Sequence, residues 1–118
     1  MTDLIACLST GKGTWEHVAR VINCMEWNNI FLITNEFAKD KFKSEKKVEL
    51  IVIDDKKTIP EMASDIRRRL EGKINDLEVG LNIVSGEGRE HMAIISALLQ
   101  LGLGIRLVVL TKEGVRVI

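Results

Sequence analysis

Two short stretches decide the fold of the chain: Ser9-Thr10-Gly11-Lys12-Gly13-Thr14 and Ser85-Gly86-Glu87-Gly88-Arg89. Each follows a short apolar run, opens a segment with helical spacing, and offers glycines, a hydroxyl and a cation. Glycine lets the backbone come close to a ligand, and a helix start presents unpaired N–H groups and a positive dipole end to an anion. One such loop is common in α/β proteins. Two of them, each at the carboxyl end of a strand, predict a single phosphate-lined crevice.

Apolar runs alternate with helical patterns along the rest of the chain. The runs predict strands at residues 4–8, 30–33, 48–53, 77–84, 105–110 and 115–118. Helical spacing predicts helices at residues 15–25, 58–70 and 89–101. Thr14 is the expected N-cap of the first helix, Thr58 and Pro60 mark the start of the second, and Gly102 ends the third. Residues 36–47 are predicted to form a short helix or an ordered loop.

This alternation predicts an α/β fold, a doubly wound and mainly parallel sheet with helices on both faces and a C-terminal antiparallel hairpin strand. In such sheets the order commonly reverses beside the first strand, so the first and fourth strands are neighbours. Ligands bind outside the carboxyl ends of the strands at that point. Because the two glycine loops leave these two strands, the topology predicts that the loops lie side by side.

Length and charge limit the possible functions. With 118 residues the chain is predicted to form one domain, 1–118, with room for one core but not two. The formal net charge is +0, from 17 Lys and Arg against 17 Asp and Glu. Broad binding to duplex DNA needs a basic face, so we expect no such partner. A compact anion held in one local pocket stays compatible with this balance.

Cysteine usage and hydropathy narrow the class further. Cys7 and Cys24 lack metal-type spacing, so we expect no metal site, no cofactor and two reduced thiols in a cytoplasmic protein. Residues 92–110 are apolar enough to raise the question of a membrane span. Polar residues and glycines interrupt this run, so a helix, a turn and a strand are predicted instead, with no membrane partner. The interrupting residues are Gln100, Gly102, Gly104 and Arg106.

Neither loop has the sequence of a standard nucleotide-binding motif. A Walker A alignment on Gly11-Lys12 places Ala6 at the first glycine and Gly13 where the Mg²⁺-binding hydroxyl should be. The dinucleotide fingerprint Gly-x-Gly-x-x-Gly fails as well, because its third glycine is replaced by Glu16 in one loop and by His91 in the other. The sequence therefore disfavours both a P-loop NTPase and a standard NAD site.

The chemistry that remains in the loops favours anion binding. Backbone N–H groups and hydroxyls would bind phosphate and ribose, while Lys12 and Arg89 would neutralise charge. The predicted ligand-binding residues are Ser9, Thr10, Gly11, Lys12, Gly13, Ser85, Gly86, Gly88 and Arg89. A structural interpretation stands beside this one. The glycines could serve only tight turns, Lys12 could be solvated, and Arg89 could pair with Glu87 or Glu90.

Other conspicuous side chains have alternative interpretations too. Trp15 could stack on a base, although its place in the apolar stripe favours the core. His17 and His91 each lie in the opening turns of a predicted helix, where histidine is more often a surface or packing residue than a catalyst. The run Arg67-Arg68-Arg69 is typical of a solvated helix face.

With these residues in place, the chain resembles a known family. The order of elements, the turn Leu8-Ser9-Thr10-Gly11, and the segment Asn82-Ile83-Val84-Ser85-Gly86-Glu87-Gly88-Arg89-Glu90-His91-Met92 are similar to those of CRISPR-associated Rossmann fold (CARF) domains of antiviral defence. The likeness spans essentially the whole chain, including the terminal hairpin. In that family the fourth strand often ends in a Gly-Gly-Thr-Lys type turn. Here Glu87 interrupts the glycines, and Arg89 would supply the cation.

The resemblance implies a Rossmann-like fold and a homodimer whose crevices face each other across a two-fold axis. It also implies a ligand of matching symmetry, a cyclic oligoadenylate, and an anionic ring suits two copies of a glycine-rich cradle. The third predicted helix is apolar on more than one face, so we expect it in the dimer interface. The apolar residues concerned are Met92, Ile94, Ile95, Ala97, Leu98 and Leu99. Family members usually carry a second domain, so a stand-alone sensor, a ring nuclease and a fragment of a longer protein all stay open.

Three hypotheses follow. The first is a sensor domain that binds a cyclic oligoadenylate. The second adds metal-independent cleavage of the ring by in-line attack of a 2′-OH, with Lys12, Arg89 and His91 as candidate catalytic residues. We rank cleavage below binding alone, because the sequence shows no tight catalytic constellation. The third is a Rossmann-like module that binds another phosphorylated metabolite or serves as a subunit of a larger complex.

Overall fold

The first strand is almost entirely apolar and lies inside the sheet. In the computed structural model, which describes residues 2–118, β1 (Asp3–Leu8) is buried at every position. Such a continuous run is typical of a strand that is covered on both faces. β1 pairs in parallel with β2 (Ile30–Thr34) on one side and with β4 (Glu78–Asn82) on the other. The predicted contact between the first and fourth strands is confirmed.

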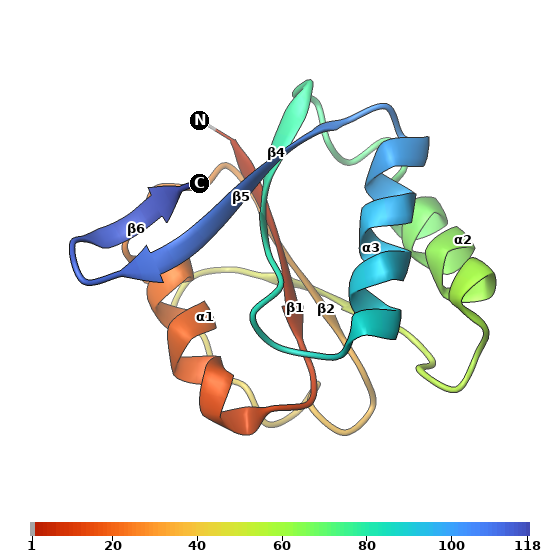
Figure 1. Cartoon of the computed structure of the whole chain (residues 1–118), viewed down its shortest axis with the longest axis horizontal. Coiled ribbons are helices and arrows are strands. Elements are labelled where there is room, and N and C mark those ends of the chain that lie inside the picture. The colour runs from red at the N-terminus through yellow and green to blue at the C-terminus, as the bar shows by residue number, and fades with distance from the viewer. Residues whose placement is uncertain (1) are drawn as a thin grey trace.

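The whole sheet has six strands in the order β3-β2-β1-β4-β5-β6 (Figure 1). β3 (Glu49–Val52) pairs in parallel with β2, and β5 (Gly104–Thr111) pairs in parallel with β4. β6 (Gly114–Val117) pairs with β5 in the antiparallel sense and forms the predicted terminal hairpin. The reversal of strand order beside β1 makes this a doubly wound, Rossmann-like fold, as the sequence predicted.

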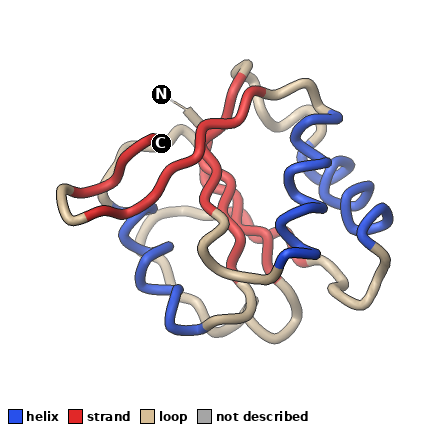
Figure 2. The backbone as a smooth tube through the Cα atoms, in the orientation of Figure 1, coloured by secondary structure: helices blue, strands red, loops and turns tan. Residues whose placement is uncertain are grey.

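Helices cover both faces of the sheet. α1 (Trp15–Asn23) lies on one side, and α2 (Ile59–Leu70) and α3 (Gly88–Gln100) lie together on the other, so the strands form a middle layer (Figure 1, Figure 2). No helix within residues 2–118 is both long enough and apolar enough to cross a membrane.

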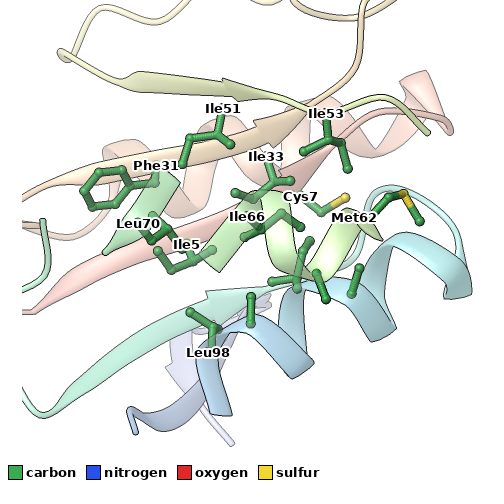
Figure 3. Packing of buried hydrophobic residues seen from close by; sticks show 14 of the residues in the cluster. Ile5, Cys7, Phe31, Ile33, Ile51, Ile53, Met62, Ile66, Leu70 and Leu98 are labelled. Atoms are coloured by element: carbon green, nitrogen blue, oxygen red, sulfur yellow. The ribbon is translucent and has the colours of Figure 1, made fainter. Parts of the chain in front are cut away.

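The core is divided by the sheet into two clusters. Successive side chains of a strand point to opposite faces, so Ile5 and Cys7 join one cluster while Leu4, Ala6 and Leu8 join the other. The first cluster packs strands against α2 and α3, and the second packs them against α1. Figure 3 shows the first cluster, and its labelled residues include Ile5, Ile33, Ile51, Met62, Ile66 and Leu70.

The start of α2 is fixed by a capping box. The Thr58 hydroxyl accepts a hydrogen bond from the backbone N–H of Glu61 at 3.3 Å, and the Glu61 carboxylate accepts one from the backbone N–H of Thr58 at 3.0 Å. This reciprocal pair satisfies two N–H groups that the first turn leaves unpaired. Pro60 lies in the same turn, where its missing N–H costs nothing. The predicted helix start is confirmed.

Three predicted boundaries need correction. α1 ends at Asn23, so Met25 lies outside the helix. Residues 36–47 form turns and bends, so the ordered loop is found and not the short helix. β4 stops at Asn82 and not at residue 84. The reason is that β5 pairs with β4 only as far as Leu107 and then turns to pair with β6, so the residues after Asn82 have no strand beside them on that side.

Candidate functional site

The two glycine loops are joined by hydrogen bonds. The backbone N–H of Gly86 donates to the carbonyl oxygen of Thr10 at 3.0 Å, and the Ser85 hydroxyl donates to the same oxygen at 3.0 Å. The backbone N–H of Ser9 donates in turn to the Ser85 hydroxyl at 3.2 Å. The loops after β1 and β4 therefore lie side by side at the carboxyl edge of the sheet, where the topology predicted them.

Both serines face the protein interior. Ser9 and Ser85 are 0% exposed, and each hydroxyl has protein partners. The Ser9 hydroxyl donates to Oε1 of Glu90 at 2.7 Å. Among the predicted ligand-binding residues, Ser9 and Ser85 thus hold the two loops together from the protein interior. The surface that a ligand could reach is formed by the remaining predicted residues.

Glu90 is part of the site, although it is not among the residues predicted from the sequence. It is only 4% exposed, and its Oε1 accepts hydrogen bonds from the Ser9 hydroxyl and from the backbone N–H of Glu87 at 3.0 Å. Within residues 2–118 its Oε2 is buried and has no hydrogen-bond partner. Burial and, to a smaller extent, the charge of the Glu90 carboxylate together raise the pKa of the neighbouring Cys7 thiol to about 12. Cys7 is therefore an inert packing residue.

Gly86 passes directly over this buried group. Its φ of 96° lies in the left-handed region, which glycine adopts without strain. A Cβ atom at this position would lie 2.6 Å from the Cys7 sulfur, 2.9 Å from Oε1 of Glu90 and 3.0 Å from the Ser9 hydroxyl. Both the backbone conformation and the available space thus require glycine here.

The loop after β1 presents the exposed part of the site. Thr10, Gly11, Lys12 and Gly13 are all exposed. Gly11 has a φ of 79° and starts a short 3₁₀ turn, Lys12–Thr14. Thr14 is the N-cap residue of α1, as predicted, but its side chain makes no capping hydrogen bond to that helix. Its hydroxyl instead donates to the Gly11 carbonyl at 2.6 Å and closes the 3₁₀ turn.

Trp15 belongs to the core and anchors the same loop. It is 7% exposed, and its indole Nε1 donates to the Ser9 carbonyl at 3.1 Å. The Lys12 ammonium lies 5.9 Å from the centre of the indole ring. The geometry supports the core interpretation of Trp15 and gives Lys12 a defined position beside the loop.

Arg89 connects α3 to the loop after β3. Its guanidinium donates to the carbonyl of Asp55 at 2.9 Å and to the carbonyl of Lys57 at 2.6 Å, and so pairs with neither Glu87 nor Glu90. Gly88 and Arg89 are the first two residues of α3, where backbone N–H groups have no carbonyl partner within the helix. Both are exposed. The second loop therefore offers backbone N–H donors and the Arg89 guanidinium, whose position is fixed by its two hydrogen bonds.

His91 and His17 have different positions. His91 is half-buried, and its Nε2 lies 2.8 Å from the Ser85 carbonyl, to which it donates. His17 belongs to α1, and its Nε2 accepts from the backbone N–H of Leu110 at 3.3 Å and faces the Asn82 amide nitrogen at 3.2 Å. That amide also donates to the carbonyl of Val108 at 2.8 Å. His17 and Asn82 together satisfy backbone groups of β5 where β4 no longer runs beside it, so His17 is structural.

Within residues 2–118 no three His, Cys, Asp or Glu side chains form a group that could hold a metal ion.

A larger side chain at position 86 should destabilise the fold. We expect Gly86→Ala to lower the free energy of unfolding by about 2 to 5 kcal/mol. Alanine is strained in the left-handed backbone conformation, and its Cβ atom would collide with the buried side chains of Cys7, Ser9 and Glu90. Gly13→Ala is the matched control, because a Cβ there meets nothing within 4 Å. Urea unfolding measures both. Equal stabilities of the two variants would show that Gly86 is not required by its surroundings.

Stability should fall at mildly acidic pH because of His17. Burial lowers the pKa of His17 below its ordinary value of 6.5. Neutral His17 therefore contributes fully to the free energy of unfolding above about pH 6.5. This contribution is lost as the pH falls toward the pKa of His17 in the folded state, because the unfolded chain takes up the proton first. We expect the free energy of unfolding to drop between pH 8 and pH 5.5, and the profile of His17→Gln, which keeps an acceptor oxygen, to be flatter. Parallel profiles would remove His17 as the cause.

Comparisons with known proteins add little to this geometry. The sequence matches no protein-family model and no curated protein. Among solved structures, the chain is similar to the FMN-dependent cysteine decarboxylase TvaF from thioviridamide biosynthesis, with 13% sequence identity over 89% of each chain and a TM-score of 0.34. A likeness at that TM-score carries no argument about ligand or activity, so any function has to be inferred from the loops themselves.

Proposed function

We propose that this domain binds a cyclic oligoadenylate at its paired glycine loops, as a homodimeric sensor of the CARF type. The observation that carries the proposal is the direct hydrogen bonding of the two loops, at 3.0 Å between Gly86 and Thr10, with exposed glycines and Lys12 beside them. The sequence resemblance supports the identity of the ligand. The proposed function belongs to the cytoplasm, where both cysteines would stay reduced.

The exposed groups suit a phosphodiester. The backbone N–H groups around Gly11, Lys12 and Gly13 lie in a turn that comes close to the surface without side-chain obstruction, and Lys12 adds a positive charge. The first turn of α3 adds the N–H groups of Gly88 and Arg89. Hydrogen bonds between backbone donors and an anion are stronger than those between neutral groups. We therefore assign phosphate binding to the exposed residues of both loops, chiefly to Lys12.

The proposed dimer is supported by an apolar face on α3, although Ile94, Ala97 and Leu98, which were expected in the interface, are buried in the core instead. Met92 is 63% exposed and Leu99 is 62% exposed, and with the half-buried Ile95 they border a groove of about 460 Å³. Large exposed apolar side chains that gather on one face mark an interaction surface. The same helix begins at the second glycine loop. A two-fold axis beside α3 would therefore bring two copies of the paired loops together around one symmetric ring.

Ring cleavage is the second candidate. Because His91 donates from Nε2 to the Ser85 carbonyl, its Nδ1 is the nitrogen that remains for proton transfer. Lys12 and Arg89 would stabilise the developing charge, and no metal ion is needed for such a step. Binding of a different phosphorylated metabolite is the remaining alternative, and the experiment below separates the three.

Titration with cyclic tri-, tetra- and hexa-adenylate in the presence of EDTA tests the proposal. We expect calorimetry to give one ring per two chains. We expect Lys12→Ala to weaken binding about ten- to a hundredfold, because a charge-assisted hydrogen bond contributes about 1.5 to 3 kcal/mol. Chromatography of the same sample then shows whether the ring has been opened.

Lys73→Ala is the matched control for this titration. Lys73 lies at the opposite edge of the sheet, before β4, and within residues 2–118 its side chain makes one interaction, an exposed ion pair with Glu49. Its removal should leave both affinity and stability unchanged. Absence of binding to all three rings, or equal affinity of the Lys12 and Lys73 variants, would refute the proposed function.

A charge on the apolar face of α3 should separate the subunits. We expect sedimentation analysis to find a dimer of the wild type and a folded monomer of Met92→Glu, because burying an unpaired carboxylate opposes association. Leu77→Glu is the control, since Leu77 is 84% exposed just before β4 and does not border the groove on α3. A monomeric wild type, or a dimeric Met92 variant, would contradict this interface.

A further inference from the structure

A separate cleft lies at the same edge of the sheet as the glycine loops. It has a volume of about 660 Å³ and is bordered by residues 35–37 after β2, by residues 52–57 after β3, and by Asp65, Arg68 and Arg69 of α2. Because β1, β2, β3 and β4 are parallel, the loops that follow them all meet at the carboxyl edge. We call this space the edge cleft.

The edge cleft and the glycine loops share a wall. Arg89, from the first turn of α3, donates to the carbonyls of Asp55 and Lys57 at 2.9 and 2.6 Å, and both residues border the cleft. A ligand that contacts the exposed start of α3 is therefore next to the loop that lines the cleft. This physical continuity is what connects the cleft to the proposed function.

The walls of the edge cleft are held by side chains that are already paired. Asp65 accepts from Lys57 at 2.9 Å and is also paired with Arg68. The Asn35 amide donates to the Asp55 carboxylate at 3.1 Å. These bonds consume most of the charge around the cleft and leave it close to neutral. The walls are thus fixed before any ligand binds, which lowers the entropic cost of binding.

Three groups at the edge cleft remain for a ligand. Phe37 is 58% exposed, although aromatic side chains are usually covered, and the Lys41 ammonium lies 4.6 Å from its ring centre. Asp54 is exposed and uses one oxygen, Oδ1, to accept the backbone N–H of Lys56 at 3.0 Å. Within residues 2–118 the Lys56 ammonium has no partner and is exposed. The edge cleft is therefore bordered by a flat apolar ring, a carboxylate oxygen and a cation, from Phe37, Asp54 and Lys56.

From this combination we propose that the edge cleft binds a nucleoside unit of an adenine nucleotide. The base stacks on Phe37, a free ribose hydroxyl donates to the Asp54 carboxylate, and Lys56 lies toward the phosphate. This inference deepens the proposed function and rests on it for the identity of the base. A ring held at the glycine loops carries nucleosides that point away from its phosphates, and the edge cleft receives one of them from each chain.

Adenosine 5′-monophosphate tests the edge cleft without the ring. We expect titration of the ¹⁵N-labelled protein to shift the amide signals of residues 35–37 and 53–57, and inorganic phosphate at the same concentration to leave them in place. Phe37→Ala should weaken the binding of the mononucleotide at least about fivefold, as loss of one base–aromatic stack does. Phe37→Trp should retain it. Leu77→Ala, at another exposed apolar residue, at the opposite edge of the sheet, should have no effect.

Several outcomes would overturn the inference. They are shifts confined to residues 10–13 and 86–89, the same shifts with phosphate alone, no shifts at all, or an unchanged affinity of Phe37→Ala. The two proposals fail separately. Ring binding that depends on Lys12 but not on Phe37 would leave the sensor function and remove the edge cleft. Mononucleotide binding that depends on Phe37, without binding of any ring, would leave the edge cleft and remove the sensor function.

Discussion

The candidate site depends on the hydrogen bond between the Ser9 hydroxyl and the buried carboxylate of Glu90. This bond, 2.7 Å long, joins the loop after β1 to the first turn of α3. A buried carboxylate is unfavourable unless donors reach it, and Oε1 of Glu90 receives both Ser9 and the backbone of Glu87. The backbone has to pass over this group without a side chain, which is why Gly86 stands there. The geometry of both glycine loops follows from this one polar contact.

A site braced in this way would be ordered before the proposed ligand binds. Ser85 and the indole of Trp15 hold the first loop from the protein side, and Arg89 is fixed by two carbonyls of the loop after β3. Binding therefore does not have to order these loops, and that ordering is otherwise a main cost of association. The buried Ser9–Glu90 contact would thus contribute to the affinity for the proposed ligand indirectly, because it fixes the positions of the exposed loop residues.

The strands and helices could be predicted because they depend on patterns within a few residues, such as the continuous apolar run of β1 and Thr58 with Pro60 at the start of α2. The directions of the loop side chains could not. The Ser9–Glu90 and Arg89–Asp55 contacts join residues 81 and 34 positions apart, and no local pattern reports them. One signal was available. Glu87 and Glu90 have the spacing of an N-cap and its third helical residue, which indicates that Glu90 turns back to the backbone and not toward Arg89.

Electrostatics gives the two loops different tasks. The carboxylate of Glu87 stands at the N-terminus of α3, where it takes the position in which a bound anion would gain most from the helix dipole. The loop after β1 has no acidic residue from Ser9 to Trp15 and carries Lys12. A phosphate therefore gains more at the first loop than at the second. Because the net charge of the chain is +0, long-range attraction adds little, and affinity has to come from these local contacts. For the proposed ligand, this arrangement makes Lys12 the stronger phosphate contact and the exposed N–H groups at the start of α3 the weaker one.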